Sequence, residues 1–240
     1  MKQKTPPDSQ AFSRSEGDVR RRAHIVAERK FYFLFLFLLA YLILYPYTQN
    51  GGFEYLAFRA FGTVVTLLSV YAVSFRRTFV YVALVLAVPT LMQRILLARA
   101  TEGALPLISI AFSFAFDVFV VVVIFHHVFT ENAPTSEAIF GALCIYLLVG
   151  FSFAAAYSML ATVQPRAFYL DPISNVRSVP NRFDLIYYSF GTITSLGAAG
   201  ITPVSDQARS LSVIEAILGI LYLAVLIARL MSTYRGRPTA

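Results

Sequence analysis

The sequence predicts an all-α membrane protein, and three observations lead to that fold class. The 240 residues are 58% hydrophobic and only 14% charged, with a mean hydropathy of +0.66, which is typical of integral membrane proteins. The apolar residues are gathered in long segments that charged residues separate. Before the last segment, the stretch from Asn181 to Pro203 changes from apolar and aromatic residues to Thr, Ser, Gly and Ala. Irregular backbone at membrane depth needs shelter by protein or by a water-filled cavity, so this stretch predicts a re-entrant pore loop.

Six apolar segments are each close to the roughly 20 residues that cross a bilayer as a helix. They cover Phe31 to Tyr47, Tyr55 to Phe75, Thr78 to Leu97, Pro106 to Phe129, Glu137 to Thr162 and Leu211 to Tyr234. The connections between the first five are short, which predicts antiparallel neighbours. The connection before the sixth is long and holds the predicted pore loop.

The distribution of the 20 Lys and Arg residues predicts the orientation. With a cytoplasmic N-terminus, 13 of them fall on the cytoplasmic side and 7 on the outside, as the positive-inside rule requires. We therefore expect both termini in the cytoplasm. The net charge of +7 then reflects topology, and no nucleic-acid partner is expected.

The segments predict a division of the chain into four parts. We expect a basic, largely disordered cytoplasmic N-terminus (1–30), a four-helix transmembrane domain (31–130), a pore domain (135–235) and a cytoplasmic tail (236–240). Within the pore domain, we expect the outer helix at 137–162, the pore helix and filter at 181–203 and the inner helix at 211–234. The fourth segment contains no Lys or Arg, whereas a voltage sensor carries arginines along one helix. Packing, assembly and ligand sensing remain open as roles for the first four helices.

Ionisable residues within the apolar segments are candidates for function. Asp117 lies at membrane depth, where it either has a functional role or pairs with an arginine of a neighbouring helix, such as Arg59 or Arg94. His126 and His127 are adjacent, so their side chains point about 100° apart on a helix and make a poor metal chelate. We expect these histidines to lie at the interface and to be partly solvated.

The sequence does not predict an enzyme. It has no Gly-x-Ser-x-Gly elbow, no His-Glu-x-x-His pair and no phosphate-binding glycine loop. The single cysteine, Cys144, cannot form an intrachain disulfide and is interpreted as a buried packing residue.

The stretch from Asn181 begins as a short helix. Asn181 can act as the N-cap and Asp184 as its capping-box partner. About ten residues at 1.5 Å each cover only half the membrane. The negative end of the helix dipole would then face the bilayer centre, where it lowers the cost of a cation. The residues that follow, Thr192 to Ser195, offer hydroxyl and carbonyl oxygens.

Three motifs of the chain resemble ion-channel sequences. Residues 189–197, S-F-G-T-I-T-S-L-G, with I-T-P at 201–203, resemble the pore signature of the potassium-channel superfamily, S-F-x-T-L-T-T-V-G-Y-G-D-I-T-P. Residues 141–150 and 208–230 resemble the outer and inner helices of bacterial two-helix pore domains. The resemblance covers about residues 135 to 232 and implies a homotetramer in the bacterial inner membrane, surrounded by lipid. Each chain supplies one pore loop, and the filter needs four.

The filter departs from the signature of that superfamily. The candidate ion pathway consists of Thr194, Ser195, Leu196, Gly197, Ala198, Ala199 and Gly200. In an ungapped alignment, the tyrosine that braces the family's filter from behind is Ala198, the second glycine is Ala199 and the aspartate is Gly200. An alanine forced into left-handed backbone geometry costs about 1–2 kcal/mol. We therefore expect the usual ladder of carbonyl rings to be altered above Gly197.

The inner helix contains two further candidates. Gly219 is either a gating hinge or a site of close helix packing. Glu215 is expected to support the filter from behind, as is Tyr188 of the pore helix, and the alternative for Glu215 is exposure to the ion path.

The sequence leaves three functions open. The first is a cation channel of relaxed or altered selectivity, with K⁺ or Na⁺ as the permeant ion and no cofactor or other metal. The second is a pore-domain relative that does not conduct and serves as a membrane scaffold or sensor. The third is another small-molecule transporter, although the chain shows no inverted repeat.

Overall fold

The computed structural model describes residues 30–44, 53–96, 105–130, 135–175 and 177–235. The predicted N-terminal region before residue 30 and the tail at 236–240 lie outside these ranges. The helices of the described part are α2 (Lys30–Leu44), α3 (Phe53–Ala72), α4 (Arg77–Leu96), α5 (Leu105–Thr130), α6 (Thr135–Val163), α7 (Arg182–Ile193) and α8 (Asp206–Arg235). Two short strands, β1 (Phe168–Leu170) and β2 (Ile201–Pro203), complete the elements.

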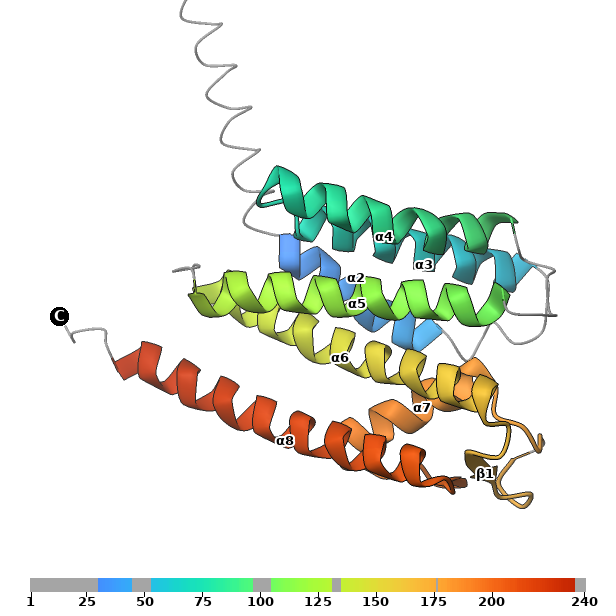
Figure 1. The fold of residues 1–240 in the computed structure, drawn as a ribbon. Coiled ribbons are helices and arrows are strands. Elements are labelled where there is room, and N and C mark those ends of the chain that lie inside the picture. Colours follow the sequence, from blue (N-terminus) through green and yellow to red (C-terminus); the bar gives the residue numbers. More distant parts are fainter. Residues whose placement is uncertain (1–29, 45–52, 97–104, 131–134, 176, 236–240) are drawn as a thin grey trace, which may run out of the picture.

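Helix α6 lies between the predicted four-helix part and the helices of the predicted pore domain. It packs against α2 and α5 on one side and against α7 and α8 on the other. Helices α3 and α4 lie beyond α2 and α5, and the short helix α7 lies between α6 and α8 (Figure 1). The predicted pore helix is therefore enclosed by the predicted outer and inner helices.

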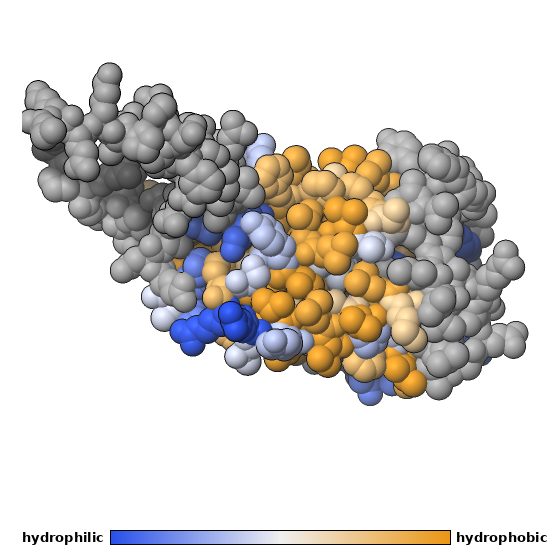
Figure 2. Space-filling view, turned by 90° about the horizontal axis from the view of Figure 1, so that it is seen from above, coloured by the Kyte–Doolittle hydropathy of each residue, from blue (hydrophilic) through white to orange (hydrophobic). Residues whose placement is uncertain are grey.

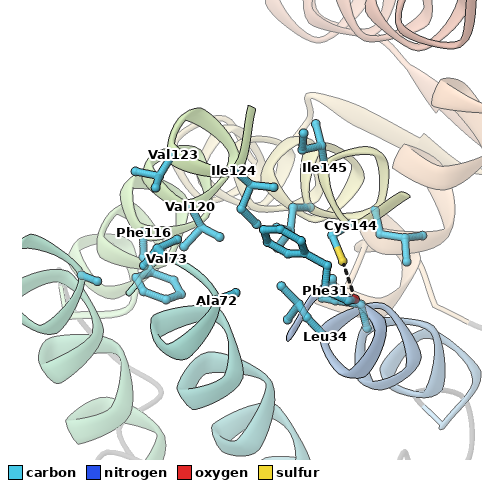
Figure 3. Close-up of a cluster of buried hydrophobic side chains, with 14 of the residues drawn as sticks. Phe31, Leu34, Ala72, Val73, Phe116, Val120, Val123, Ile124, Cys144 and Ile145 are labelled. Carbon is cyan, nitrogen blue, oxygen red and sulfur yellow. Dashed lines mark hydrogen bonds between the residues drawn. The ribbon is translucent and has the colours of Figure 1, made fainter. Parts of the chain in front are cut away.

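A first apolar core fills the space between α2, α3, α4, α5 and α6 (Figure 3). Its fully buried side chains include Phe31, Leu34, Val73, Val120, Ile124 and Ile145. The Cys144 thiol donates a 3.3 Å hydrogen bond to the Phe31 carbonyl oxygen, which links α6 to α2. The expectation that Cys144 is a buried packing residue is confirmed.

A second core lies behind the pore helix. The rings of Tyr157, Phe168 and Tyr188 meet edge to face, with centroids 5.0–5.5 Å apart, the arrangement that aromatic pairs prefer. Leu185 and Ile201 complete the buried cluster around them. This core fixes α7 against α6 and against the β1–β2 pair.

Among the residues that the structure describes, three helices are long and apolar enough to span a membrane, over Leu107–Thr130, Glu137–Val163 and Asp206–Met231. The described apolar parts of the other three candidates are shorter, at Lys30–Leu44, Ala60–Ala72 and Arg77–Met92. Helix α4 exposes large apolar side chains, among them Tyr81, Val85, Val88 and Met92. Figure 2 shows the broad apolar surface that results on this side of the molecule. An exposed apolar face of this extent fits lipid, and six spans stay a prediction.

The long connection holds structure that the sequence analysis did not predict. Strands β1 and β2 pair antiparallel, with Phe168 opposite Pro203 and Leu170 opposite Ile201. Helix α8 begins at Asp206, ahead of the predicted start at Leu211. The β1–β2 pair therefore ends the loop after the pore helix and leads the chain into α8.

Candidate functional site

The pore helix α7 begins as the sequence predicts. The Asn181 side chain accepts hydrogen bonds from the backbone N–H groups of Phe183 and Asp184 at 2.8 and 2.9 Å. The Asp184 carboxylate accepts from the Asn181 N–H at 2.8 Å. The predicted capping box is confirmed. With 12 residues, the helix is about 18 Å long, too short to cross a bilayer.

The helix ends in the candidate filter. Thr194 is the C-cap, and its hydroxyl donates to the Phe190 carbonyl at 2.6 Å. The Thr192 hydroxyl donates in the same way to the Tyr188 carbonyl at 2.8 Å. These threonines hold the last turn together, and their hydroxyl oxygens keep lone pairs that can still accept. Residues 194–197 and Ala199 are exposed in the single chain.

The left-handed residues of the loop match the ungapped alignment at Gly197 but not at the second glycine of the signature. Positive φ angles are found at Ser195 (58°), Gly197 (84°) and Gly200 (82°). Neither Ala198 nor Ala199 has a positive φ, so neither alanine bears the cost of left-handed geometry; an altered carbonyl ladder above Gly197 stays a prediction. The second left-handed glycine of the loop is Gly200, one position later than in the superfamily signature.

Two carbonyl groups above Gly197 are bound within the chain. The Ala198 carbonyl accepts from the Ile201 N–H at 3.2 Å. The Gly200 carbonyl accepts from the Asp171 N–H at 2.9 Å and from Asn175 Nδ2 at 2.8 Å. Both of these carbonyl groups therefore accept hydrogen bonds from other backbone or side-chain groups of the same chain.

The loop lies directly on the pore helix. The Gly197 N–H donates to the Gly191 carbonyl at 3.0 Å. A Cβ at Gly191 would lie 3.2 Å from backbone atoms of Gly197 and Ala198, so glycine is needed for this contact. Ala198 packs against the second core, which places its side chain behind the loop, where the alignment puts the family's bracing tyrosine.

Glu215 is fully buried and ties three helices together. Its carboxylate accepts from the Ser189 hydroxyl on α7 at 2.5 Å and from the Tyr157 hydroxyl on α6 at 2.6 Å. The Ser189 oxygen also lies 2.7 Å from the Gly150 carbonyl oxygen on α6. The other predicted support residue, Tyr188, shares a 2.6 Å hydrogen bond with Ser212 on α8. Both residues lie behind the loop and away from solvent.

Gly219 lies where the inner helix meets the end of the pore helix. A Cβ on Gly219 would collide with the Ile193 carbonyl oxygen and lie 2.8 Å from Ile193 Cγ1. The same carbonyl accepts a 3.1 Å hydrogen bond from the Tyr146 hydroxyl. This contact is close packing, one of the two roles left open for Gly219. A role as a gating hinge stays a prediction.

Asp117 lies on α5, in the predicted four-helix part. It lines a cavity of about 50 Å³ together with Tyr41, Thr66 and Arg182. A cavity of that size holds a few water molecules. The side chains of its two predicted partners, Arg59 and Arg94, lie outside the described part of the structure.

The two adjacent histidines occupy different environments. His126 is exposed, as expected for an interfacial residue. The His127 side chain is only 13% exposed, stacks on Phe75 with ring centroids 3.8 Å apart and lies 3.8 Å from a carboxylate oxygen of Glu137. Within the described residues, no group of three or more His, Cys, Asp or Glu side chains could hold a metal ion.

Sequence reasoning missed the residues that hold the loop from outside. Asp171, Ser174 and Asn175 form a turn after β1, and the Asp171 N–H and Asn175 Nδ2 donate to the Gly200 carbonyl. The Asp-Pro pair followed by Ser and Asn is a turn signal. Nothing in that signal indicates which distant residue the turn contacts.

Comparison with known proteins assigns the region around this site. A family model described as "Ion channel" matches residues 143–235, which cover most of α6 and all of α7 and α8. Neither the search of curated proteins nor that of solved structures gave a match. The matched helices are the ones that enclose the candidate filter, so this match and the apolar character of α6 and α8 support an ion-channel pore domain in the membrane.

Proposed function

We propose that the protein is a homotetrameric cation channel of weak or altered selectivity. The observation that carries this proposal is the internal hydrogen bonding of the Ala198 and Gly200 carbonyls. Selectivity for K⁺ over Na⁺ requires a series of carbonyl rings that replace the ion's hydration shell. The Ala198 carbonyl belongs to the outer end of that series in the alignment, and the Gly200 carbonyl lies just beyond it. With both bound in each loop, the outer end of the series is lost.

The inner part of the loop keeps the chemistry of a cation site. Residues 194–197 are exposed at the C-terminal end of α7, where the helix dipole places a partial negative charge. Their carbonyl oxygens supply the ligands that a monovalent cation takes in such pores. Passive conduction of K⁺ and Na⁺ follows from this arrangement.

The exposed surfaces of the pore domain support assembly with copies of the same chain. Leu196 is 79% exposed. Large apolar side chains along α8 are exposed too, among them Ile214, Ile217, Leu221, Val225 and Ile227. Four copies around one axis would bring the loops together and cover part of this surface. We place the assembly in the bacterial inner membrane with both termini in the cytoplasm.

Ion flux from purified protein in lipid vesicles tests conduction. We expect vesicles that contain the protein to take up K⁺ and Na⁺ faster than protein-free vesicles. Replacing chloride by gluconate should leave the rate unchanged, since cations carry the flux. A folded tetramer without cation flux, across the range of pH and voltage, would contradict conduction and favour the scaffold or sensor.

A further inference from the structure

We propose that the external turn formed by residues 171–175, here called the outer turn, positions the outer end of the filter loop. Its positioning residues are Asp171 and Asn175, which hold the Gly200 carbonyl through the Asp171 N–H and Asn175 Nδ2. The effect on permeating ions rests on the proposed function. The anchoring itself does not, because it is a property of the folded chain.

The outer turn is built to present these two donors. The Asp171 carboxylate accepts from the Ser174 hydroxyl at 2.9 Å and from the Ile173 N–H at 3.2 Å. The Asp171 carbonyl accepts from the Asn175 N–H at 2.9 Å and from Asn175 Nδ2 at 3.1 Å. The two N–H bonds of the Asn175 amide therefore bridge the turn and the filter loop.

Gly200 fits the outer turn because it has no side chain. A Cβ at this position would lie 2.8 Å from both Asn175 Nδ2 and Ser174 Cβ. The φ angle of +82° is one that glycine adopts readily and other residues rarely do. The superfamily signature has an aspartate at this position. An aspartate side chain at position 200 would occupy the space of Ser174 and Asn175, so it is incompatible with the outer turn in its present position. The chain holds the end of the loop from outside instead.

The outer turn affects the filter loop through residues 198–201, which are linked to one another by neighbouring hydrogen bonds. The Gly200 carbonyl is fixed by the outer turn, the next residue, Ile201, pairs with Leu170 of β1, and the Ile201 N–H binds the Ala198 carbonyl. Loosening the outer turn therefore releases the Gly200 carbonyl and weakens the hold on Ala198. Ala199 lies between these two anchored residues and is exposed, so it can report their mobility.

A cysteine at Ala199 tests the anchor without any need for ion flux. The native Cys144 is buried, and the parent protein gives its background reactivity. In the A199C protein, a further change of Asn175→Asp keeps the size of the side chain and removes the N–H donor. We expect a neutral thiol reagent to modify Cys at this position on the order of tenfold faster, the effect of losing one well-formed hydrogen bond.

Ile173→Asp is the matched control. Ile173 lies in the same turn and is 95% exposed, so this change adds the same charge without touching Gly200. It should leave the modification rate unchanged. An equal rate in the Asn175→Asp and Ile173→Asp proteins would overturn the anchor. Asn175→Ala, which also removes the Nδ2 donor, should raise the modification rate in the same way. In a separate measurement on the parent protein, rapid hydrogen exchange at the Asp171 amide would also contradict the proposal.

Reversal potentials separate positioning from a purely structural role. Under mixed K⁺ and Na⁺, Asn175→Asp should shift the reversal potential relative to the parent, whereas Ile173→Asp should not. A purely structural role would reduce the amount of folded tetramer and leave the reversal potential unchanged. If the protein does not conduct, the proposed function fails while the cysteine measurement still decides the anchor.

Discussion

Replacement of Glu215 by leucine is expected to lower the melting temperature of the protein sharply and to abolish conduction. The change leaves the Tyr157 hydroxyl without its 2.6 Å acceptor in a buried site. The Ser212 hydroxyl, 3.5 Å away, is then its remaining partner, and a buried polar group without a well-formed hydrogen bond costs about 1–3 kcal/mol. The Ser189 hydroxyl loses its 2.5 Å partner as well, so α7 loses one of its hydrogen bonds to α8 and keeps the one between Tyr188 and Ser212. Thermal unfolding in detergent and vesicle flux measure the two effects.

Glu215→Gln is the matched variant for this prediction. The Ser189 hydroxyl has one proton, and both the Gly150 carbonyl and the Glu215 carboxylate lie within its reach. A glutamine amide can donate to Ser189, which frees that proton for Gly150, and its oxygen can still accept from Tyr157. We expect stability and conduction close to those of the parent.

A double replacement tests whether the Tyr157 hydroxyl is the cause. Tyr157→Phe removes the donor that Glu215→Leu leaves without its acceptor, and replacing both partners by apolar groups can be nearly neutral. The double variant should therefore be more stable than Glu215→Leu alone. If Glu215→Leu by itself unfolds at the temperature of the parent, the carboxylate does not hold the pore helix.

Gly219→Ala is expected to destabilise the pore domain and to reduce conduction strongly. The new Cβ would collide with the Ile193 carbonyl oxygen, a backbone atom at the end of the pore helix that cannot move alone. Overpacking of this kind costs about 1–3 kcal/mol, although alanine favours a helix over glycine by about 1 kcal/mol. Thermal unfolding and single-channel recording measure the change.

Gly141→Ala provides the control. There the Cβ would lie 2.6 Å from Val128 Cγ2, which belongs to a side chain and not to the backbone of the pore helix, so conduction should be affected less than by Gly219→Ala. The hinge interpretation of Gly219 makes a different prediction, namely an altered open probability in a protein of unchanged stability. That result would contradict close packing as the role of Gly219.

The parts of the site that follow from local chemistry could be predicted from the sequence. Asn181 and Asp184 indicate the start of the pore helix because a capping box is a local pattern. An acid such as Glu215 in an apolar segment indicates a buried partner, because an uncompensated charge there is costly. The identity of those partners, Ser189 and Tyr157, depends on how three helices pack.

The outer half of the filter could not be predicted in the same way. Asn175 and Gly200 are 25 positions apart, and no periodic pattern links them. The alignment places the second left-handed residue at Ala199, whereas the chain uses Gly200, because glycine adopts this geometry without strain. A filter redesigned as T-V-G-Y-G-D would put a side chain at Gly200, in the space of Ser174 and Asn175.

The reversal potential under bi-ionic conditions, with K⁺ on one side of the membrane and Na⁺ on the other, tests the central claim most directly. Because the carbonyls of Ala198 and Gly200 are bound within the chain, the pore should discriminate weakly between the two ions. We predict a reversal potential close to zero in the folded tetramer. A reversal potential set by K⁺ alone would contradict a filter that has lost its outer carbonyl rings.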